Sequence, residues 1–287
     1  MINKSDILFE DNEIIVIHKK AGVAVESNKI GTPDLISMLK TYISRNQRAA
    51  RIRSNTPVNV YMIHRLDQVV EGVIVFAKTK EAAANLSRQL TNEGFQKYYY
   101  AAVCGAPSKN VSHLNIVKND NGFIQIEDKL IKTDNKSIID NENANDKIGK
   151  KAILEYIEIA RDCSIENVNY KVPSLDMQSN EKSEYLAKLE ENQNAIEEKN
   201  KNSLVTLLKI HLKTGRFHQI RAQLSHMDCP ILGDVKYGAP EKRRGEIALC
   251  SYKLSFTHPK TGEKMDFKIK PVSSLFAPFD AFLSVDD

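Results

Sequence analysis

An acidic and a basic side chain stand two positions apart in the motif HRLD, where Arg65 is followed by Asp67. The run Val73–Ala77 comes shortly after and is apolar, β-branched and aromatic, which predicts a strand buried on both faces. Asp67 is therefore expected on a short loop that the core anchors, where a side chain is held still and yet stays accessible to a substrate. A carboxylate in such a place can act on a substrate as an anion.

Arg65 could share the side of the extended chain on which Asp67 lies. A guanidinium at that position would keep the carboxylate ionised and oriented, because a nearby positive charge favours the anionic form. The same two residues could equally form an ion pair with a purely structural role at the mouth of the strand. These two residues alone leave both interpretations open.

A second basic side chain is expected near a buried surface much further along the chain. The segment Leu204–Leu212 predicts a strand, and Phe217–Met227 predicts a helix with an apolar stripe on one face. Arg221 lies at the edge of that stripe. Because a partly buried arginine needs an anion, the sequence predicts an acidic partner for Arg221.

Other elements must position these groups. Strands are predicted at 14–18, 58–63, 95–104, 151–159, 247–256 and 264–269, with weaker ones near 113–117 and 122–126. Helices are expected at 32–45, with Thr32 as N-cap, and at 80–92, with Thr79 as N-cap. In the strand at 95–104 the side chain of Tyr99 would ordinarily serve for packing.

The composition is that of a globular protein with a real core, since 41% of the residues are hydrophobic and 27% are charged. The four cysteines show no CxxC spacing and the seven histidines form no cluster at ligand spacing, so no zinc site is expected. There is no long apolar run and no apolar leader at the start. These features predict a cytoplasmic protein with reduced cysteines and no metal.

The charge is distributed unevenly along the chain. Residues 164–203 contain eight acidic and five basic residues, whereas the whole chain has a net charge of +4. The rest of the chain therefore carries +7, which suits a partner with a phosphate backbone, although a single basic cluster is more often a solvated face. The polar segment 162–202 is expected to be an insertion, partly a solvated helix and partly a flexible loop.

Three separated motifs together resemble the RluA family of pseudouridine synthases. They are HRLD followed by Gly72 and by Ala77-Lys78, the pattern K-x-Y-x-A-x-V-x-G at 97–105, and TGRFHQIR followed by P-I-x-G-D and Y-G at 230–238. The segment ILFEDNEIIVIHKKAG near the start and L-x-F-x-H-P near the end add support. The resemblance spans nearly the whole chain except the polar stretches at 110–149 and 162–202.

The resemblance implies that the protein isomerises uridine to pseudouridine in ribosomal or transfer RNA without a metal, nucleotide or redox cofactor. Asp67 takes the place of the family's catalytic aspartate, and Tyr99 that of the tyrosine stacked on the target base. Arg221 takes the place of the basic residue paired with the aspartate, and Arg65 that of the arginine that helps to extrude the nucleotide. Neighbours in these motifs are expected to support the site: His64, Leu66, Thr214, Gly215, Arg216, His218, Gln219, Ile220 and Leu249.

The fold that the resemblance implies is α+β, with a mixed, mainly antiparallel central sheet in two halves flanked by helices. Asp67, Tyr99 and Arg221 are expected to converge in a cleft between the halves. Residues 1–287 are expected to form a single catalytic domain that acts as a monomer. The S4 RNA-binding module of some members is not expected, because the resemblance begins by Ile7. The catalytic domain must then supply the affinity for RNA itself, or rely on a partner or on the structure of the substrate.

The sequence departs from the family's pattern at three places. VEG at 70–72 stands where Thr-Ser-Gly is common, and LCS at 249–251 stands where Leu-His-Ala is usual. Phe217 replaces the threonine or serine that usually precedes His-Gln-Ile-Arg. Since none of these changes removes a predicted site residue, they are expected to affect substrate preference more than activity.

Two other functions stay open on the sequence. A catalytically silent RNA-binding protein of the same fold would need lysines and aromatic side chains, but no aspartate in a pocket. A glycoside hydrolase would need a second carboxylate near Asp67, and Glu71 is the candidate close in sequence. Tight RNA binding without turnover would favour the former, and hydrolysis of nucleosides the latter.

Overall fold

The computed structural model describes residues 2–27, 31–51, 57–92, 94–107, 116–118, 122–140, 149–163, 170–171, 204–240 and 245–283. The chain forms two compact units. The first contains Met1–Tyr98 and Cys250–Pro271, and the second contains Tyr99–Leu249 and Val272–Ser284. Strand β5 (Gln96–Cys104) begins in the first unit and ends in the second.

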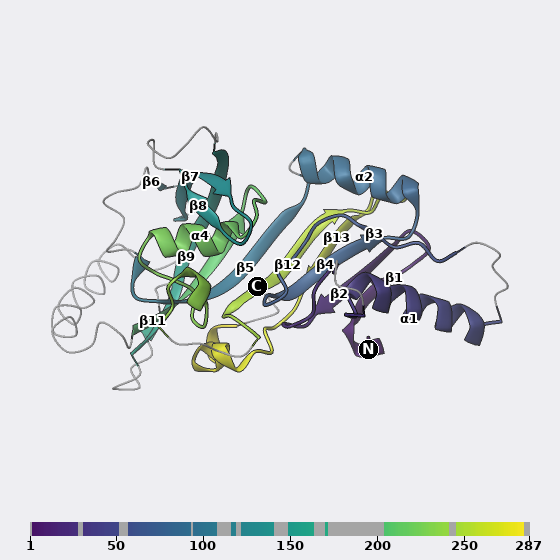
Figure 1. Ribbon diagram of the computed structural model, residues 1–287, viewed down its shortest axis with the longest axis horizontal. Coiled ribbons are helices and arrows are strands. Elements are labelled where there is room, and N and C mark those ends of the chain that lie inside the picture. The colour runs from purple at the N-terminus through teal and green to yellow at the C-terminus, as the bar shows by residue number, and fades with distance from the viewer. Residues whose placement is uncertain are drawn as a thin grey trace. The chain divides into compact units, whose positions relative to one another are not determined.

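The first unit is a sheet with two α-helices (Figure 1). Its strands follow the order β1, β2, β4 and β12, with β13 paired to β12 and β3 paired to β4. β12 runs parallel to β4, and the other pairs in this unit run antiparallel. The elements are a 3-10 helix (Lys4–Asp6), β1 (Ile7–Glu10), β2 (Ile14–Lys19), α1 (Leu35–Ala49), β3 (Tyr61–Met62), β4 (Glu71–Ala77), α2 (Lys80–Thr91), β12 (Leu249–Thr257) and β13 (Lys264–Lys268).

The core of the first unit lies along β2 and β4, in which every residue is buried. This confirms the buried strand predicted at Val73–Ala77 and extends it back to Glu71. Gly72 lets β4 approach β12, because a Cβ atom at this position would lie 2.4 Å from Cβ of Ser251. The φ of Gly72 is +146°, a conformation that residues with a side chain rarely adopt. Both the close approach and the backbone conformation therefore require glycine at this position.

The second unit is built on long antiparallel strands (Figure 1). The strand order is β5, β11, β9, β7 and β6, with β10 paired to β9 and β8 paired to β7. Helix α4 contacts β7 and β8. The elements are β6 (Ile116–Lys118), β7 (Ile124–Lys132), β8 (Ser137–Ile139), β9 (Lys150–Cys163), β10 (Tyr170–Lys171), β11 (Leu204–Leu212), α4 (Gln219–His226) and two 3-10 helices (Val235–Tyr237 and Ser274–Phe282).

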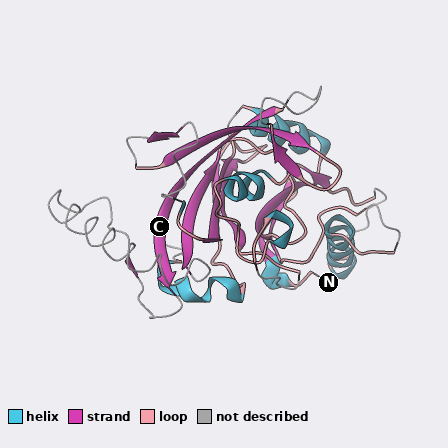
Figure 2. Ribbon diagram, turned by 60° about the vertical axis from the view of Figure 1, so that its left-hand side comes forward, coloured by secondary structure: helices cyan, strands magenta, loops and turns pink. Residues whose placement is uncertain are grey.

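The core of the second unit is dominated by β9 and β11. These strands pair over the whole length of β11, and residues such as Leu154, Leu207 and Ile210 are completely buried. Strands make up most of the regular structure of the described residues, as Figure 2 shows. The predicted α+β class with mainly antiparallel strands is therefore confirmed.

The predicted start of the first helix is wrong. The N-cap of α1 is Asp34 rather than Thr32, and its carboxylate accepts hydrogen bonds from the backbone N–H groups of Ser37 (2.8 Å) and Ser27 (3.0 Å). An aspartate that accepts from two backbone donors is the better cap. The helix also continues past residue 45 to Ala49.

Other boundaries differ as well. The strand predicted at 58–63 is limited to Tyr61–Met62, and α4 begins at Gln219 rather than Phe217 because His218 adopts a left-handed conformation (φ 50°). β8, β10 and the 3-10 helix Ser274–Phe282 were not predicted. Most of the insertion expected at 162–202, including its helix, lies outside the described residues.

Cys229 and Cys250 are buried, as expected of core thiols. In the parts of the chain that the structure describes, no helix has the length and apolar character needed to cross a membrane.

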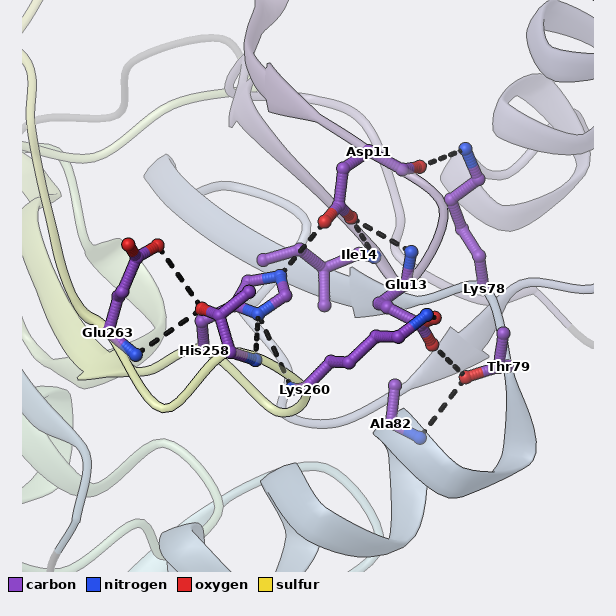
Figure 3. A network of polar contacts seen from close by, with 10 residues as sticks. Asp11, Glu13, Ile14, Lys78, Thr79, Ala82, His258, Lys260 and Glu263 are labelled. Atoms are coloured by element: carbon purple, nitrogen blue, oxygen red, sulfur yellow. Dashed lines mark hydrogen bonds and ion pairs between the residues drawn. The ribbon is translucent and has the colours of Figure 1, made fainter.

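A polar network joins three turns of the first unit (Figure 3). The carboxylate of Asp11 accepts hydrogen bonds from the backbone N–H groups of Glu13 and Ile14, both at 2.8 Å, and contacts Nε2 of His258 at 2.9 Å. The Glu13 carboxylate accepts from the Thr79 hydroxyl (2.7 Å), which caps α2. Burial alone would raise the pKa of Asp11, but the two N–H groups and His258 lower it below its ordinary value.

We expect Asp11→Ala to lower the free energy of unfolding by about 2–3 kcal/mol, because hydrogen bonds to a charged acceptor are lost and buried donors stay unpaired. The contribution of Asp11 is present above its ordinary pKa of 3.8 and is lost as the pH falls through its lowered folded value. Urea denaturation measures the change. Glu26→Ala, at an exposed site, is the matched control, and a loss equal to that of the control would contradict the prediction.

Candidate active site

The HRLD motif lies in the connection between β3 and β4 of the first unit. Leu66 is 6% exposed and Val70 is 2% exposed, so apolar side chains on both sides of Asp67 insert into the core. Asp67 itself is half-buried. The loop is therefore anchored by two hydrophobic side chains, as the sequence predicted, and Asp67 between them is not fully buried.

Hydrogen bonds at Gln68 fix the backbone next to Asp67. The carbonyl oxygen of Gln68 accepts from the N–H of Gly22 (2.8 Å) and from Nζ of Lys19 (3.2 Å). The Gln68 side-chain amide donates to the carbonyl oxygen of Gly22 (3.0 Å), and the N–H of Val70 donates to the carbonyl oxygen of Asp67 (3.1 Å). The end of β2 and the residues after it thus clamp the loop in one conformation.

Lys19 is the buried cation of this clamp. It is 1% exposed, and its ammonium also donates to the carbonyl oxygen of Lys20 (3.0 Å). Burial lowers the pKa of Lys19 to about 8, and the carboxylates of Asp67 and Glu71 oppose this shift. A positive charge near Asp67 therefore comes from the neighbouring strand β2, which the sequence did not predict.

Glu71 is enclosed at the start of β4 and does not face a substrate. It is 3% exposed, and its Oε1 lies 3.4 Å from Nε2 of His18 and 3.6 Å from Sγ of Cys250. Burial, together with the Glu71 carboxylate, raises the pKa of the Cys250 thiol well above its ordinary value. A carboxylate so enclosed cannot activate a water molecule against a sugar, which argues against glycoside hydrolysis.

Arg65 is exposed to solvent. Whether its guanidinium pairs with the Asp67 carboxylate stays a prediction. An exposed guanidinium next to a half-buried loop is available for an anionic ligand.

His64 supports the loop as a neutral ring. Its Nε2 accepts a hydrogen bond from the N–H of Val75 (3.4 Å), and its ring packs edge-on against Phe95. Burial and the Lys97 ammonium lower the pKa of His64 to about 3. The ring therefore remains an acceptor at neutral pH.

We expect the protein to lose stability on mild acidification because of His64. Between pH 6.5 and about 3 the unfolded chain binds a proton at this ring that the folded chain does not bind, so the free energy of unfolding falls as the pH falls. The contribution of this single group is at most about 1.4 kcal/mol per pH unit. Urea denaturation across this range measures it, and His64→Gln, which keeps an acceptor, should flatten the upper part of the curve; an unchanged slope would contradict the assignment.

Arg221 lies on α4 in the second unit and is 5% exposed. Its Nε and Nη2 bind the two carboxylate oxygens of Asp234 at 2.6 and 2.9 Å, and its guanidinium lies 5.0 Å from the centre of the Tyr237 ring. The sequence predicted that this arginine would be partly buried and would need an anion, and Asp234 is such an anion. The bidentate geometry fixes the plane of the guanidinium.

The loop before α4 is held by the side chain of Gln219. Its carbonyl oxygen accepts from the Thr214 hydroxyl (2.8 Å) and from the N–H of Arg216 (3.0 Å), while its amide donates to the carbonyl oxygen of Ile153 (3.0 Å). The Nε of Arg216 donates to the carbonyl oxygen of Lys151 (2.8 Å). The loop is thereby tied to β9, with Gly215 and Arg216 at the surface and Ile220 in the core.

Two further predicted residues belong to buried strands. Tyr99 on β5 is 5% exposed, and Leu249 at the start of β12 is 4% exposed. Asp67 lies in the first unit and both Tyr99 and Arg221 lie in the second, so their convergence in one cleft stays a prediction.

The burial of Lys19 and the pairing of Asp234 with Arg221 were not predicted from the sequence. The run before Lys19 is entirely apolar except for His18, and this continuity was a signal that the strand carries its lysine into the core. Asp234 was noted as part of a motif but not as the partner of Arg221. Thirteen positions separate the two residues, so only the tertiary structure brings them together.

The pattern of the family described as RNA pseudouridylate synthase matches residues 13–226, which is more than half of the chain. A tRNA pseudouridine synthase C from Haemophilus ducreyi is 27% identical over 268 residues, covering 91% of this chain and 88% of the relative. A dual-specificity RNA pseudouridine synthase RluA from Haemophilus influenzae is 28% identical over 274 residues and covers 92% of each chain.

Two solved human structures share the fold. RNA Pseudouridylate Synthase Domain Containing 1 aligns with a TM-score of 0.62 at 16% identity, over 95% of this chain and 86% of that chain. RNA Pseudouridylate Synthase Domain Containing 4 aligns with a TM-score of 0.58 at 18% identity, over 96% and 91%. With the family pattern covering most of the sequence and its motifs in place, the chain belongs to the RNA pseudouridylate synthase family, in the RluA branch, and is an isomerase that converts uridine in RNA to pseudouridine.

Proposed function

We propose that this protein modifies specific uridines in transfer or ribosomal RNA and that Asp67 is its catalytic residue. The observation that carries the proposal is that Asp67, half-buried within the motif HRLD, lies on a loop whose backbone is held by hydrogen bonds at Gln68 and Val70. The relatives from the two Haemophilus species are named for tRNA and for dual-specificity activity, which supports these RNA classes. The protein would act as a monomer in the cytoplasm.

The reaction explains why one carboxylate is enough. Breaking the bond between C1′ of the ribose and N1 of uracil builds positive charge on the sugar, which an ionised aspartate can stabilise or trap. Because the uracil turns and rebonds through C5, no water has to be activated. Attack on the sugar, attack on the base and removal of a ribose proton are all routes open to Asp67.

The other predicted residues would receive the nucleotide. Tyr99 would stack on the detached uracil while it rotates, and Arg221, already oriented by Asp234, would pair with Asp67. Base flipping is required because a stacked uridine cannot reach such a group, and it costs a few kcal/mol. Exposed Arg65 would help to extrude the nucleotide, and the net charge of +7 outside residues 164–203 would offset part of the cost through phosphate contacts.

The test is incubation of the purified protein with transfer RNA and with ribosomal RNA that lack the modification. Carbodiimide adducts and primer extension then locate any pseudouridine. New stops at defined positions are expected, and transcriptome-wide mapping in cells with and without the gene should identify the same sites. RNA binding without any pseudouridine would favour the silent RNA-binding alternative, and release of free uracil would indicate hydrolysis.

A further inference from the structure

An aromatic and basic surface lies on the second unit beside α4. We name it the Phe217 surface. Its members are Lys132, Lys136, Arg216, Phe217 and His218. Both lysines and Arg216 are exposed, and the two rings are half-buried. Asp134 lies in the turn between the two lysines and contributes one negative charge. The three basic side chains outweigh it, so the surface carries a net positive charge.

The two rings form a rigid stack. The centroids of Phe217 and His218 are 3.9 Å apart and their planes differ by 20°. The left-handed conformation of His218 makes this stacking of sequence neighbours possible. The ring nitrogen Nδ1 of His218 shares a hydrogen bond with the Tyr237 hydroxyl (3.0 Å), which also accepts from the N–H of Ser137 (2.8 Å).

The hairpin of β7 and β8 is fastened to this stack. The Ser137 hydroxyl donates to the carbonyl oxygen of Phe217, so the turn that carries the lysines cannot move independently of the rings. Nζ of Lys132 lies 5.1 Å from the centre of the Phe217 ring, and Nζ of Lys136 lies 5.9 Å from the centre of the Tyr237 ring. A preorganised aromatic face and lysine cations beside it are the two parts of a site for single-stranded RNA.

A nucleobase should compete with Lys132 for the face of the Phe217 ring. An exposed cation over an aromatic ring strengthens binding by roughly 2- to 5-fold, whereas a nucleobase stacked on such a ring contributes roughly 5- to 150-fold. A base should therefore displace the Lys132 ammonium from the Phe217 ring. The long side chain of Lys132 would then reach a phosphate of the same nucleotide.

The Phe217 surface is linked to Arg221 within the second unit. Tyr237 contacts His218 on one side and the Arg221 guanidinium on the other. A nucleotide on Phe217 would thus lie near Arg221, which the proposed function pairs with Asp67.

We propose that the Phe217 surface binds an unpaired nucleotide flanking the target uridine, with its base stacked on Phe217 and its phosphate held by Lys132 and Lys136. This inference rests on the proposed function for the identity of the target. It makes Phe217 a determinant of substrate choice, in favour of uridines in single-stranded loops.

The test measures RNA affinity apart from catalysis. Fluorescence anisotropy gives the Kd of a labelled hairpin RNA with uridines in its loop, and of a fully paired duplex of the same length. Phe217→Ala should raise the Kd for the hairpin about 10-fold and leave the duplex nearly unchanged, while Phe217→Tyr should bind as the unaltered protein does. Lys132→Ala should reduce the salt dependence of the hairpin Kd by the equivalent of about one phosphate contact. Lys264→Ala, at an exposed site of the first unit, is the control and should leave this salt dependence unchanged.

Three results would overturn the inference: unchanged hairpin binding by Phe217→Ala, an equal loss for the duplex, or an equal loss in Phe217→Tyr. An unaltered protein that binds neither RNA would overturn it as well. Pseudouridine formation is scored in parallel, where Phe217→Ala should raise KM with little change in kcat. If the unaltered protein forms no pseudouridine but the hairpin results hold, the proposed function fails and the binding surface stands.

Discussion

Asp67→Asn is expected to reduce pseudouridine formation by about 10⁴-fold or more, the scale of loss when a reacting group is removed. Asparagine has the same size and can occupy the same place on the clamped loop. It carries no negative charge, however, so it can neither stabilise nor trap the developing positive charge on the sugar. Since the side chain is half-exposed, we expect the free energy of unfolding to change by less than about 1 kcal/mol.

The measurement is single-turnover pseudouridine formation, accompanied by RNA affinity and urea denaturation. Asp280→Asn, an exposed aspartate of the second unit outside the Phe217 surface, is the matched control and should keep full activity. Asp67→Asn should still bind RNA and unfold normally, which separates lost chemistry from lost structure. Activity equal to that of the unaltered protein would remove Asp67 from the mechanism.

Asp234→Ala is expected to lower the free energy of unfolding by about 3–5 kcal/mol. The change leaves the Arg221 guanidinium buried without the carboxylate that binds it bidentately at 2.6 and 2.9 Å. Uncompensated burial of a charge is far more costly than loss of a surface pair. Because Asp234 also orients Arg221, pseudouridine formation should fall in the fraction that remains folded.

A double variant separates the two effects. Arg221→Met with Asp234→Leu removes both charges and should recover much of the stability, because buried ion pairs are often replaceable by apolar residues of similar size. The double variant should not recover pseudouridine formation, because it lacks the guanidinium that would pair with Asp67. As a control, Asp266→Ala breaks the more exposed pair with Lys253 and should cost less than about 1 kcal/mol. Equal costs for Asp234→Ala and Asp266→Ala would contradict the prediction.

Local sequence patterns were sufficient for much of the fold. The boundaries of β11 were predicted as observed, and Thr79 was correctly identified as the N-cap of α2. These features depend on alternation and on capping, which act over a few residues. The left-handed turn at His218 could not be predicted in this way, because it is stabilised by Tyr237 and by the hairpin of β7 and β8.

The candidate site was predictable to a similar extent. The motif identified Asp67, and the apolar residues around it indicated a loop anchored by the core. Burial of Lys19 and the pairing of Arg221 with Asp234 depend on which charges neutralise each other across the fold. Such long-range compensation leaves no periodic trace in the sequence, so it became visible only in the three-dimensional arrangement.

The clamp at Gln68 has an evolutionary consequence. Its hydrogen bonds use peptide groups of residues 22, 67, 68 and 70, together with the side-chain amide of Gln68 and the amine of Lys19. None of these hydrogen bonds uses the carboxylate of Asp67, so the clamp itself could persist in a duplicated gene that loses the acid at position 67. Pseudoenzymes should arise readily from this scaffold, and a descendant of that kind would be recognised by an intact Lys19 beside a substituted residue 67.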